Sequence, residues 1–305
     1  MAQKISVVIP NYNGSNLLAK NLPTVIKNCP GAEIIVVDDA SSDNSVSLVR
    51  ENFKNIKLVS IPVNKGFSNA VDTGVSKANS NLVLILNSDV SLSSDVVKRV
   101  ITYFDNPKTF AVALADKSHE GNKIVIRGRG NAKFQKGFLT HFAINPKKGK
   151  TLWVSGGSGL FDRNKFMELG GFDRLYAPFY WEDIDLSYRA WKAGWQCFFE
   201  PSAQVDHYHE EGAIKKHHSQ FKIKSTSYRN QFLFVWKNVS DYSLLVQHLL
   251  WLPYHFAKGL VRADWAFFAG FFSALPKVPQ LVFNWQMENG KWEISDREVL
   301  NVVKP

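Results

Sequence analysis

The stretch EIIVVDD, residues 33–39, places four β-branched apolar residues directly before two carboxylates. Such a run is apolar on both faces, which is typical of a central parallel strand covered by helices on each side. Similar runs recur along the first part of the chain, with amphipathic helix-like segments between them: ISVVIP at 5–10, IKLVSI at 56–61, LVLIL at 82–86 and FAVALA at 110–115. The repeating pattern predicts an α/β fold built on a sheet of parallel strands.

Polar residues follow three of these runs, and ligands bind outside the carboxyl ends of strands in open sheets of this kind. They are Asn11 to Asn13, Asp38 with Asp39, and Asn87 to Asp89. Asp39 is suited to accept a hydrogen bond from a nucleotide base, but Asp38 and Asp39 could equally cap the next helix, as we expect for Asp43. Asp89 could anchor a divalent cation that carries a diphosphate, although Asn-Ser-Asp also forms ordinary turns.

Length, charge and cysteine content narrow the class of protein. The 305 residues suit one large catalytic domain with an appendage. A net charge of +10 implies an anionic partner: nucleic acid, a phospholipid surface or a phosphorylated substrate. Residues 117–150 contain nine lysine and arginine residues and one acidic residue, Glu120. We predict that this stretch is a long loop or irregular hairpin on the acceptor side. Two cysteines and the lack of a leader-like N-terminus favour the cytoplasm.

A second group of carboxylates lies in WEDIDLSYRAWKAGW, residues 181–195. Apolar spacing predicts a helix that begins at about Glu182 and ends near Gly194. Asp185 can pair with Arg189 one turn later. Glu182 and Asp183 are adjacent, so repulsion between them would raise the proton affinity of a general base, and we expect Trp181 to form the wall of a cleft beside them.

Two aromatic and leucine-rich segments lie within 242–276, and charged residues or proline interrupt both. Neither reaches the roughly twenty apolar residues that a membrane-spanning helix needs. They are predicted to be amphipathic helices. Two interpretations stay open: the helices lie on the cytoplasmic face of an anionic membrane, or they pack on the catalytic domain or in a homo-oligomer.

Taken in order, several segments resemble the inverting nucleotide-sugar glycosyltransferases of family two, closest to rhamnosyltransferase-like members. The segments are SVVIPNYN, VVDDASSD, NKGFSNAVDTG, LILNSD, VSGGSGLFDR, GGFDRLYAPFYWEDIDLSYRAWKAG and PSAQVDHYHEEG, and the resemblance covers roughly residues 4 to 235. It implies a GT-A fold in residues 1–225, with a nucleotide-sugar half (1–115) and an acceptor half (116–225) fused in one mixed sheet. Residues 226–305 would be a C-terminal helical region that binds membrane or another copy.

The resemblance also implies roles for individual residues. Asp183 matches the catalytic base, with Glu182 beside it, and Asp89 matches the carboxylate that binds Mg²⁺ or Mn²⁺. Asn87 departs from the usual first aspartate of that metal motif. His207 matches a late histidine that contacts metal or diphosphate. The positions that match the binding site of the nucleotide-sugar donor are Pro10, Tyr12 and Asp39 for the nucleoside, and Asn64, Gly66, Asn69 and Ser88 nearer the ribose and diphosphate.

The implied function is transfer of a sugar, with inversion, to a hydroxyl of a glycan or lipid-linked acceptor in bacterial surface polysaccharide or glycolipid synthesis. Three other classes compete. A nucleotidyltransferase is disfavoured because no Gly- and Arg-rich phosphate loop follows the first strand, and a dinucleotide oxidoreductase because no G-x-G-x-x-G does. A nucleic-acid-binding protein fits the basic charge, but few aromatics accompany the basic stretch and no known binding module is present.

Overall fold

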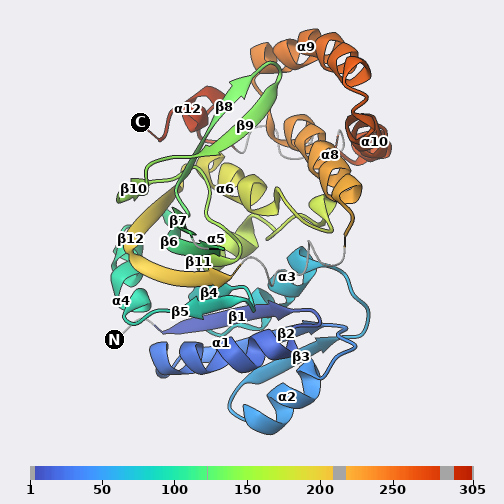
Figure 1. The fold of residues 1–305 in the computed structure, drawn as a ribbon. Coiled ribbons are helices and arrows are strands. Elements are labelled where there is room, and N and C mark those ends of the chain that lie inside the picture. Colours follow the sequence, from blue (N-terminus) through green and yellow to red (C-terminus); the bar gives the residue numbers. More distant parts are fainter. Residues whose placement is uncertain (1–3, 122, 209–217, 282–291, 304–305) are drawn as a thin grey trace.

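The computed structural model describes residues 4–121, 123–208, 218–281 and 292–303. Its centre is a ten-stranded mixed sheet with the order β10-β12-β6-β11-β4-β1-β2-β3, to which β5 and β7 add at β12 and β6. The N-terminal half lies at one end of the molecule and the C-terminal helices at the other (Figure 1). The predicted α/β class with one mixed sheet is therefore confirmed.

The N-terminal half is built from the parallel strands that the sequence predicts. Its strands are β1 (Ile5–Asn11), β2 (Glu33–Asp39), β3 (Lys57–Ile61) and β4 (Leu82–Leu86). Its helices are α1 (Ser15–Asn28), α2 (Ser45–Asn52) and α3 (Phe67–Lys77). Successive side chains of a strand point to opposite faces. Val8 therefore joins one apolar cluster under α3, whereas Val7 joins a second cluster with Leu18 and Val49 under α1 and α2.

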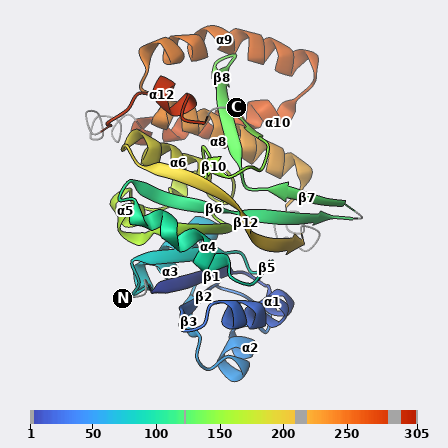
Figure 2. The same cartoon turned by 90° about the vertical axis from the view of Figure 1, so that its left-hand side faces the viewer.

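The second half extends the same sheet with strands of mixed direction. Its elements are β5 (Val90–Leu92), α4 (Val96–Ile101), β6 (Thr109–Glu120), β11 (Ser158–Asp162), α5 (Arg163–Glu168), α6 (Glu182–Lys192) and β12 (Gln196–Tyr208), with short 3-10 turns η1 (Thr102–Asp105) and η2 (Arg174–Tyr176). β11 runs antiparallel to both β4 and β6, so it joins the two halves into one sheet. Figure 2 shows this continuity from the side.

The basic stretch 117–150 forms hairpins, so of the two predicted alternatives, a long loop or an irregular hairpin, the structure shows the second. It continues β6 and then forms β7 (Lys123–Arg127), β8 (Gly130–Gln135), β9 (Phe138–Ala143) and β10 (Gly149–Lys150). β7 folds back on β6, and β8 pairs with β9 across a turn at Lys136 and Gly137, both with positive φ. The basic residues are thus spread over two hairpins and the segment that leads into β10. Two of them form ion pairs within the chain: Arg127 with Glu120, and Lys148 with Glu200.

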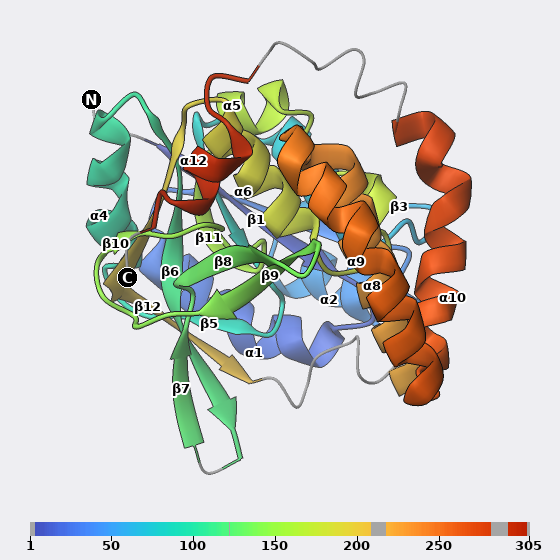
Figure 3. The same cartoon turned by 90° about the horizontal axis from the view of Figure 1, so that it is seen from above.

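The C-terminal region is helical, as predicted. It contains α8 (Gln220–Asn238), α9 (Tyr242–Val261), α10 (Trp265–Ala274), the turn η4 (Leu275–Lys277) and α12 (Asp296–Leu300). Figure 3 shows α8, α9 and α10 grouped on one side of the molecule. Among the residues that the structure describes, every helix falls short of the length and apolar content that crossing a membrane requires.

Buried polar contacts connect α12 of this region to α6 of the second half. The fully buried Asp296 carboxylate of α12 accepts hydrogen bonds from the Tyr188 hydroxyl of α6 and from the backbone of Ser240, and it pairs with the Lys192 ammonium at 3.0 Å. The predicted boundary after residue 225 falls inside α8, so the division at that position remains a prediction.

Candidate active site

The carboxyl ends of β1 and β2 meet in a network of buried polar side chains. Asn11 Nδ2 donates to Asp38 Oδ1 at 3.1 Å, and the other Asp38 oxygen accepts from the Ser41 amide. Asp43 accepts from the amides of Ser15 and Ser45, the first residues of α1 and α2. Asp43 is thus a capping residue, as expected, whereas Asp38 fixes the loop after β2.

Asp39 positions the loop that leads into α3. Its carboxylate accepts hydrogen bonds from the amides of Lys65 and Gly66, the latter at 2.7 Å. Gly66 has φ +86°, a conformation that glycine adopts without strain, and its amide also bonds the Asn64 side chain. Three of the predicted donor-binding residues, Asp39, Asn64 and Gly66, are therefore adjacent.

The other predicted donor-binding residues lie around the same strand ends. Pro10 is buried in β1, and Tyr12 just beyond it is 39% exposed. Asn69 is buried in α3, and with its amide oxygen turned toward Arg174 it accepts from Nη2 at 2.8 Å. The Ser88 carbonyl accepts from the Asn21 side chain at 2.8 Å. Contact of these residues with a nucleotide remains a prediction.

Asp89 and His207 are brought together by strand register. Asp89 immediately precedes β5, which pairs with β12 so that His207 stands opposite Val90. The His207 Nε2 atom lies 3.3 Å from Asp89 Oδ2, and its Nδ1 lies 2.7 Å from Asp116 Oδ2 at the end of the buried part of β6. Sequence reasoning missed Asp116, although it follows the apolar run FAVALA as Asp38 and Asp89 follow theirs.

The contacts of His207 determine its charge. Burial lowers its pKa, but hydrogen bonds and ion pairs with Asp116 and Asp89 outweigh burial and raise the pKa of His207 to about 10. The ring is therefore cationic at neutral pH in the metal-free protein. Displacement of that proton by a metal would leave Asp116 to orient the ring, the arrangement that metal-binding histidines commonly have.

The residues at this position fit a divalent cation. Within the described parts of the chain, Asp89 Oδ1 is buried and has no hydrogen-bond partner, which is costly unless a ligand satisfies it. No group of three or more His, Cys, Asp or Glu side chains suited to a metal occurs among those residues. One carboxylate and one imidazole are enough for an ion that takes its remaining ligands from phosphate oxygens and water.

The glycine-rich segment at 156–159 connects the two groups of carboxylates. A Cβ atom on Gly157 would stand 2.5 Å from Asn87 Nδ2, so only glycine allows the strand β11 to approach this close. The preceding amide, that of Gly156, lowers the pKa of Asp183 by hydrogen bonding. Gly156, which bonds Asp183, is therefore next to Gly157, which lies against Asn87. Asn87 is two residues before Asp89.

Glu182 and Asp183 begin α6, as predicted. Glu182 is buried and, within the described residues, its Oε2 atom has no hydrogen-bond partner, whereas Asp183 is partly exposed and accepts from the Ile184 amide at 2.8 Å. Burial raises the pKa of Glu182, and the Asp183 charge raises it further. Burial raises the pKa of Asp183 too, against the amides of Ile184 and Gly156. Loss of water is thus the main cause, rather than the expected mutual repulsion.

The aromatic side chain that is exposed beside Glu182 and Asp183 is not the predicted one. Trp181 is 5% exposed, and its ring packs on His141 and Phe234, so it belongs to the core and does not form a cleft wall. Tyr180 is the exposed ring at this position. Both residues have positive φ, 70° for Tyr180 and 78° for Trp181, a strained backbone conformation that often occurs at functional sites.

Two buried polar groups hold this strained segment and the helix that follows it. The Asn230 Nδ2 atom of α8 lies 2.9–3.0 Å from the carbonyl oxygens of Tyr176, Phe179 and Tyr180, which share its two N–H groups. Asp185 pairs with Arg189, as predicted, and also with Lys237 of α8. No sequence signal distinguished Asn230 or Lys237 from other polar residues of an amphipathic helix.

Sequence comparison assigns the family. The model of "Glycosyl transferase family 2" matches residues 6–170. The chain is 27% identical over 215 residues to the O-antigen chain rhamnosyltransferase RfbN of Salmonella typhimurium, covering 68% of this chain and 67% of that protein. It is 24% identical over 223 residues to the N-acetylglucosaminyl-diphospho-decaprenol L-rhamnosyltransferase of Mycobacterium tuberculosis, covering 63% and 72%. It matches 48% of the length of a poly-β-1,6-N-acetyl-D-glucosamine synthase of Staphylococcus epidermidis.

Solved structures share the fold. GalNAc-T7, solved with UDP, GalNAc and Mn²⁺, superposes with a TM-score of 0.65 at 18% identity, over 79% of this chain and 49% of that one. S. aureus TarS 1–349, solved with UDP-GlcNAc, gives a TM-score of 0.58 at 16% identity, over 81% and 72%. The nucleotidyltransferase, oxidoreductase and nucleic-acid-binding alternatives are thereby set aside. The chain has the GT-A fold and belongs to glycosyl transferase family 2, the inverting glycosyltransferases.

Proposed function

We propose that this glycosyltransferase uses Mg²⁺ or Mn²⁺, held by Asp89 and His207, to bind a nucleotide-diphosphate sugar. One observation carries the proposal: the buried Oδ1 atom of Asp89 has no hydrogen-bond partner within the described residues, and Oδ2 of the same carboxylate lies 3.3 Å from His207 Nε2. A bound cation would neutralise charge on the diphosphate of the donor. Asp116 would keep the histidine ring in place, and Asp39 would keep the loop at Asn64 and Gly66 in position for the nucleoside and ribose.

The chemical step is assigned to Asp183. Its carboxylate takes the proton of the acceptor hydroxyl while that oxygen bonds to the anomeric carbon of the donor. The bond from that carbon to the diphosphate breaks, and the nucleotide diphosphate leaves with the electron pair. Attack from the face opposite the leaving group inverts the anomeric centre without a covalent sugar-enzyme intermediate. A carboxylate whose pKa is raised by burial accepts a proton more readily, which suits a general base.

Metal dependence is tested by incubating the full chain with UDP-, GDP- and dTDP-sugars, with Mn²⁺, Mg²⁺ or EDTA. We expect one donor class to be consumed and EDTA to abolish its consumption. Equal turnover with and without EDTA would refute the metal role and leave the cationic His207 as the partner of the diphosphate.

We further propose that α9 and α10 dock the enzyme on an anionic membrane surface, where a lipid-linked acceptor would be available. Apolar side chains on these helices stand in solvent: Leu250 is 75% exposed, Val261 86% and Phe272 60%. Lys258 is exposed nearby and carries a positive charge that anionic headgroups attract. Trp251 does not share this exposure, since it packs near Lys136 of the β8–β9 turn.

Flotation with anionic and neutral vesicles tests this docking. We expect the full chain to float with anionic vesicles and Leu250→Asp to float less. A matched control is Val125→Asp, a change at another exposed apolar residue on the distant strand β7. If the wild-type chain remains unbound, and Leu250→Asp instead dissociates a homo-oligomer, the helices are an assembly surface.

A further inference from the structure

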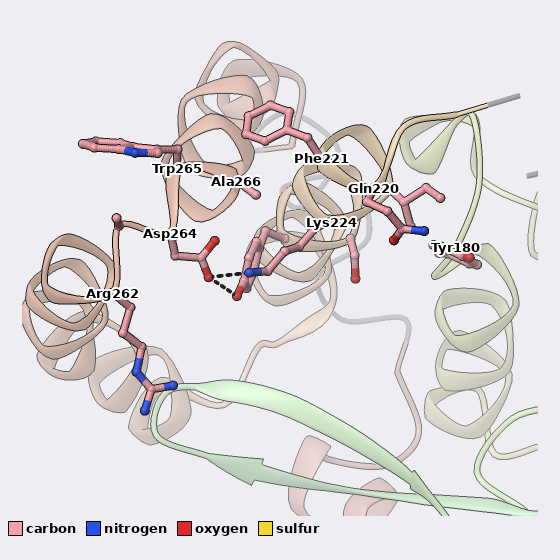
Figure 4. Close-up of a pocket in the computed structure, with 12 residues that line it drawn as sticks. Tyr180, Gln220, Phe221, Lys224, Arg262, Asp264, Trp265 and Ala266 are labelled. Carbon is pink, nitrogen blue, oxygen red and sulfur yellow. Dashed lines mark hydrogen bonds and ion pairs between the residues drawn. The ribbon is translucent and has the colours of Figure 1, made fainter. Parts of the chain in front are cut away.

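A groove lies between the first half of α8 and the junction of α9 with α10. Its volume is about 810 Å³, within the range of roughly 300–1,000 Å³ that is usual for small-molecule sites. Tyr180 forms one end, and residues 262–266 form the other (Figure 4). Tyr180 is two residues before Glu182, so this end of the groove lies at the segment that leads into α6, although neither Glu182 nor Asp183 lines the groove. None of the proposed metal or donor residues lines it.

Exposed aromatic rings line the groove. Phe221 is 54% exposed, Trp265 62% and Tyr180 39%, and in Figure 4 Trp265 lies toward one end, Tyr180 at the other and Phe221 between them. Clustered exposed aromatic side chains indicate a binding surface, because their apolar faces would otherwise remain in water. Such faces suit the C–H faces of sugar rings.

Polar groups between the rings are held in fixed positions. Asp264 Oδ2 accepts from the Tyr228 hydroxyl at 2.8 Å and pairs with the Lys224 ammonium at 2.9 Å (Figure 4). Gln220, Ser227 and Arg262 also line the groove. Carboxylate, amide, hydroxyl and guanidinium groups together can accept from and donate to sugar hydroxyls. The Asp264 carboxylate neutralises the Lys224 ammonium and leaves the charge of Arg262 to attract an anion. Sugar hydroxyls can bond all of these groups, whereas a phosphate group cannot use the Asp264 carboxylate.

We propose that this groove binds sugar units of the acceptor glycan that lie beyond the unit receiving the transferred sugar. The inference rests on the proposed function, since it takes Asp183 as the position of the reacting hydroxyl. An extended acceptor would place its terminal sugar near Asp183 and its next units against Tyr180 and then against Phe221 and Trp265. The enzyme would accordingly bind oligosaccharide acceptors more tightly than single sugars.

The test measures binding of the full chain to an array of defined bacterial oligosaccharides and their constituent monosaccharides, using wild type, Trp265→Ala and Phe272→Ala. Phe272 is the matched control: it is an exposed aromatic residue of the same helix, 60% exposed, and does not line the groove. We expect wild type and Phe272→Ala to bind oligosaccharides in preference to monosaccharides, and Trp265→Ala to bind them about 10-fold more weakly or worse, since buried aromatic anchors dominate such contacts.

Donor binding is measured in parallel, by calorimetry of UDP, GDP and dTDP with Mn²⁺ on the same three proteins, and separates the two claims. If donor binding is normal but no oligosaccharide binds, or Trp265→Ala binds as wild type does, the groove proposal is wrong and the proposed function stands. If oligosaccharides do not bind and inorganic pyrophosphate, without Mn²⁺, binds wild type more tightly than Trp265→Ala, the groove accepts a diphosphate and the glycan proposal is wrong. Absence of donor binding in all three proteins would overturn the proposed function itself.

Discussion

Replacing Asp183 with asparagine removes the carboxylate that we assign as the general base. The amide oxygen of asparagine can still accept the Ile184 N–H that Asp183 accepts at 2.8 Å, so the start of α6 should keep its conformation. It cannot take up a proton. Loss of a general base costs about 10²–10⁴ in rate, equivalent to about 2.7–5.5 kcal/mol in the activation barrier. We expect kcat to fall by that factor while donor affinity is unchanged.

The pH profile gives a second measure of the same residue. A general base works only when deprotonated, so activity rises with pH through its pKa. Burial raises the pKa of Asp183, and the acid limb should therefore lie above the value of about 4 that is usual for aspartate. In Asp183→Asn the remaining activity should lose this limb.

Initial rates of donor consumption with saturating acceptor, measured from pH 4 to 9, test both expectations. Glu182→Gln is the matched control, because it removes the neighbouring carboxylate and leaves Asp183 in place. If Asp183→Asn keeps more than about a tenth of wild-type kcat while Glu182→Gln does not, the assignment is reversed and Glu182 is the base.

Three further expectations concern the groups around the site. Asp116→Asn should weaken the binding of nucleotide diphosphate with Mn²⁺ by about 10–100-fold in calorimetry, because the His207 ring loses the carboxylate that orients it. Unchanged affinity would show that Asp116 does not orient this ring. Asp296→Ala should lower the free energy of unfolding in urea by about 3–5 kcal/mol, since the buried Lys192 ammonium loses the opposite charge of Asp296, whereas loss of the exposed Asp95–Lys98 pair should change it far less. Because the folded-state pKa of Glu182 is raised, its burial disfavours folding increasingly as pH rises above about 4.5, so Glu182→Gln should gain stability over wild type at pH 8 but not at pH 4; an equal difference at both would contradict this.

Local rules were sufficient for much of the fold and for part of the site. The apolar runs correspond to β1, β2, β3, β4 and β6. All but β3, which lies at the edge of the sheet and is largely exposed, are buried on both faces along most of their length, and such a strand must be apolar throughout. The rule that ligand-binding groups follow such strands predicted Asp39 and Asp89, which lie at the ends of β2 and β4, and α6 begins at Glu182, as predicted. His207 was predicted from its imidazole and from the motif PSAQVDH, and it lies 3.3 Å from Asp89; the ligand roles of these residues remain predictions.

Contacts between residues far apart in the sequence could not be predicted from local sequence patterns. In the hairpins of 117–150, apolar and polar side chains alternate only weakly, and lysine is frequent. Their strand pairing therefore depends on the neighbours β6 and α9 rather than on local composition. Trp181 was expected to be a cleft wall, but its positive φ turns it into the core. Asn230 supports the segment before Glu182 from a helix about fifty residues later, a contact that only the folded chain reveals.

We propose that Asp89 binds the cation that holds the donor diphosphate. This role is tested by calorimetric titration of UDP, GDP and dTDP into wild type and Asp89→Ala, with and without Mn²⁺. We expect one nucleotide to bind wild type in a Mn²⁺-dependent manner and to lose at least about tenfold in affinity in the variant, whose fold should be intact by circular dichroism. Equal Mn²⁺-dependent affinity in the two proteins would contradict the account.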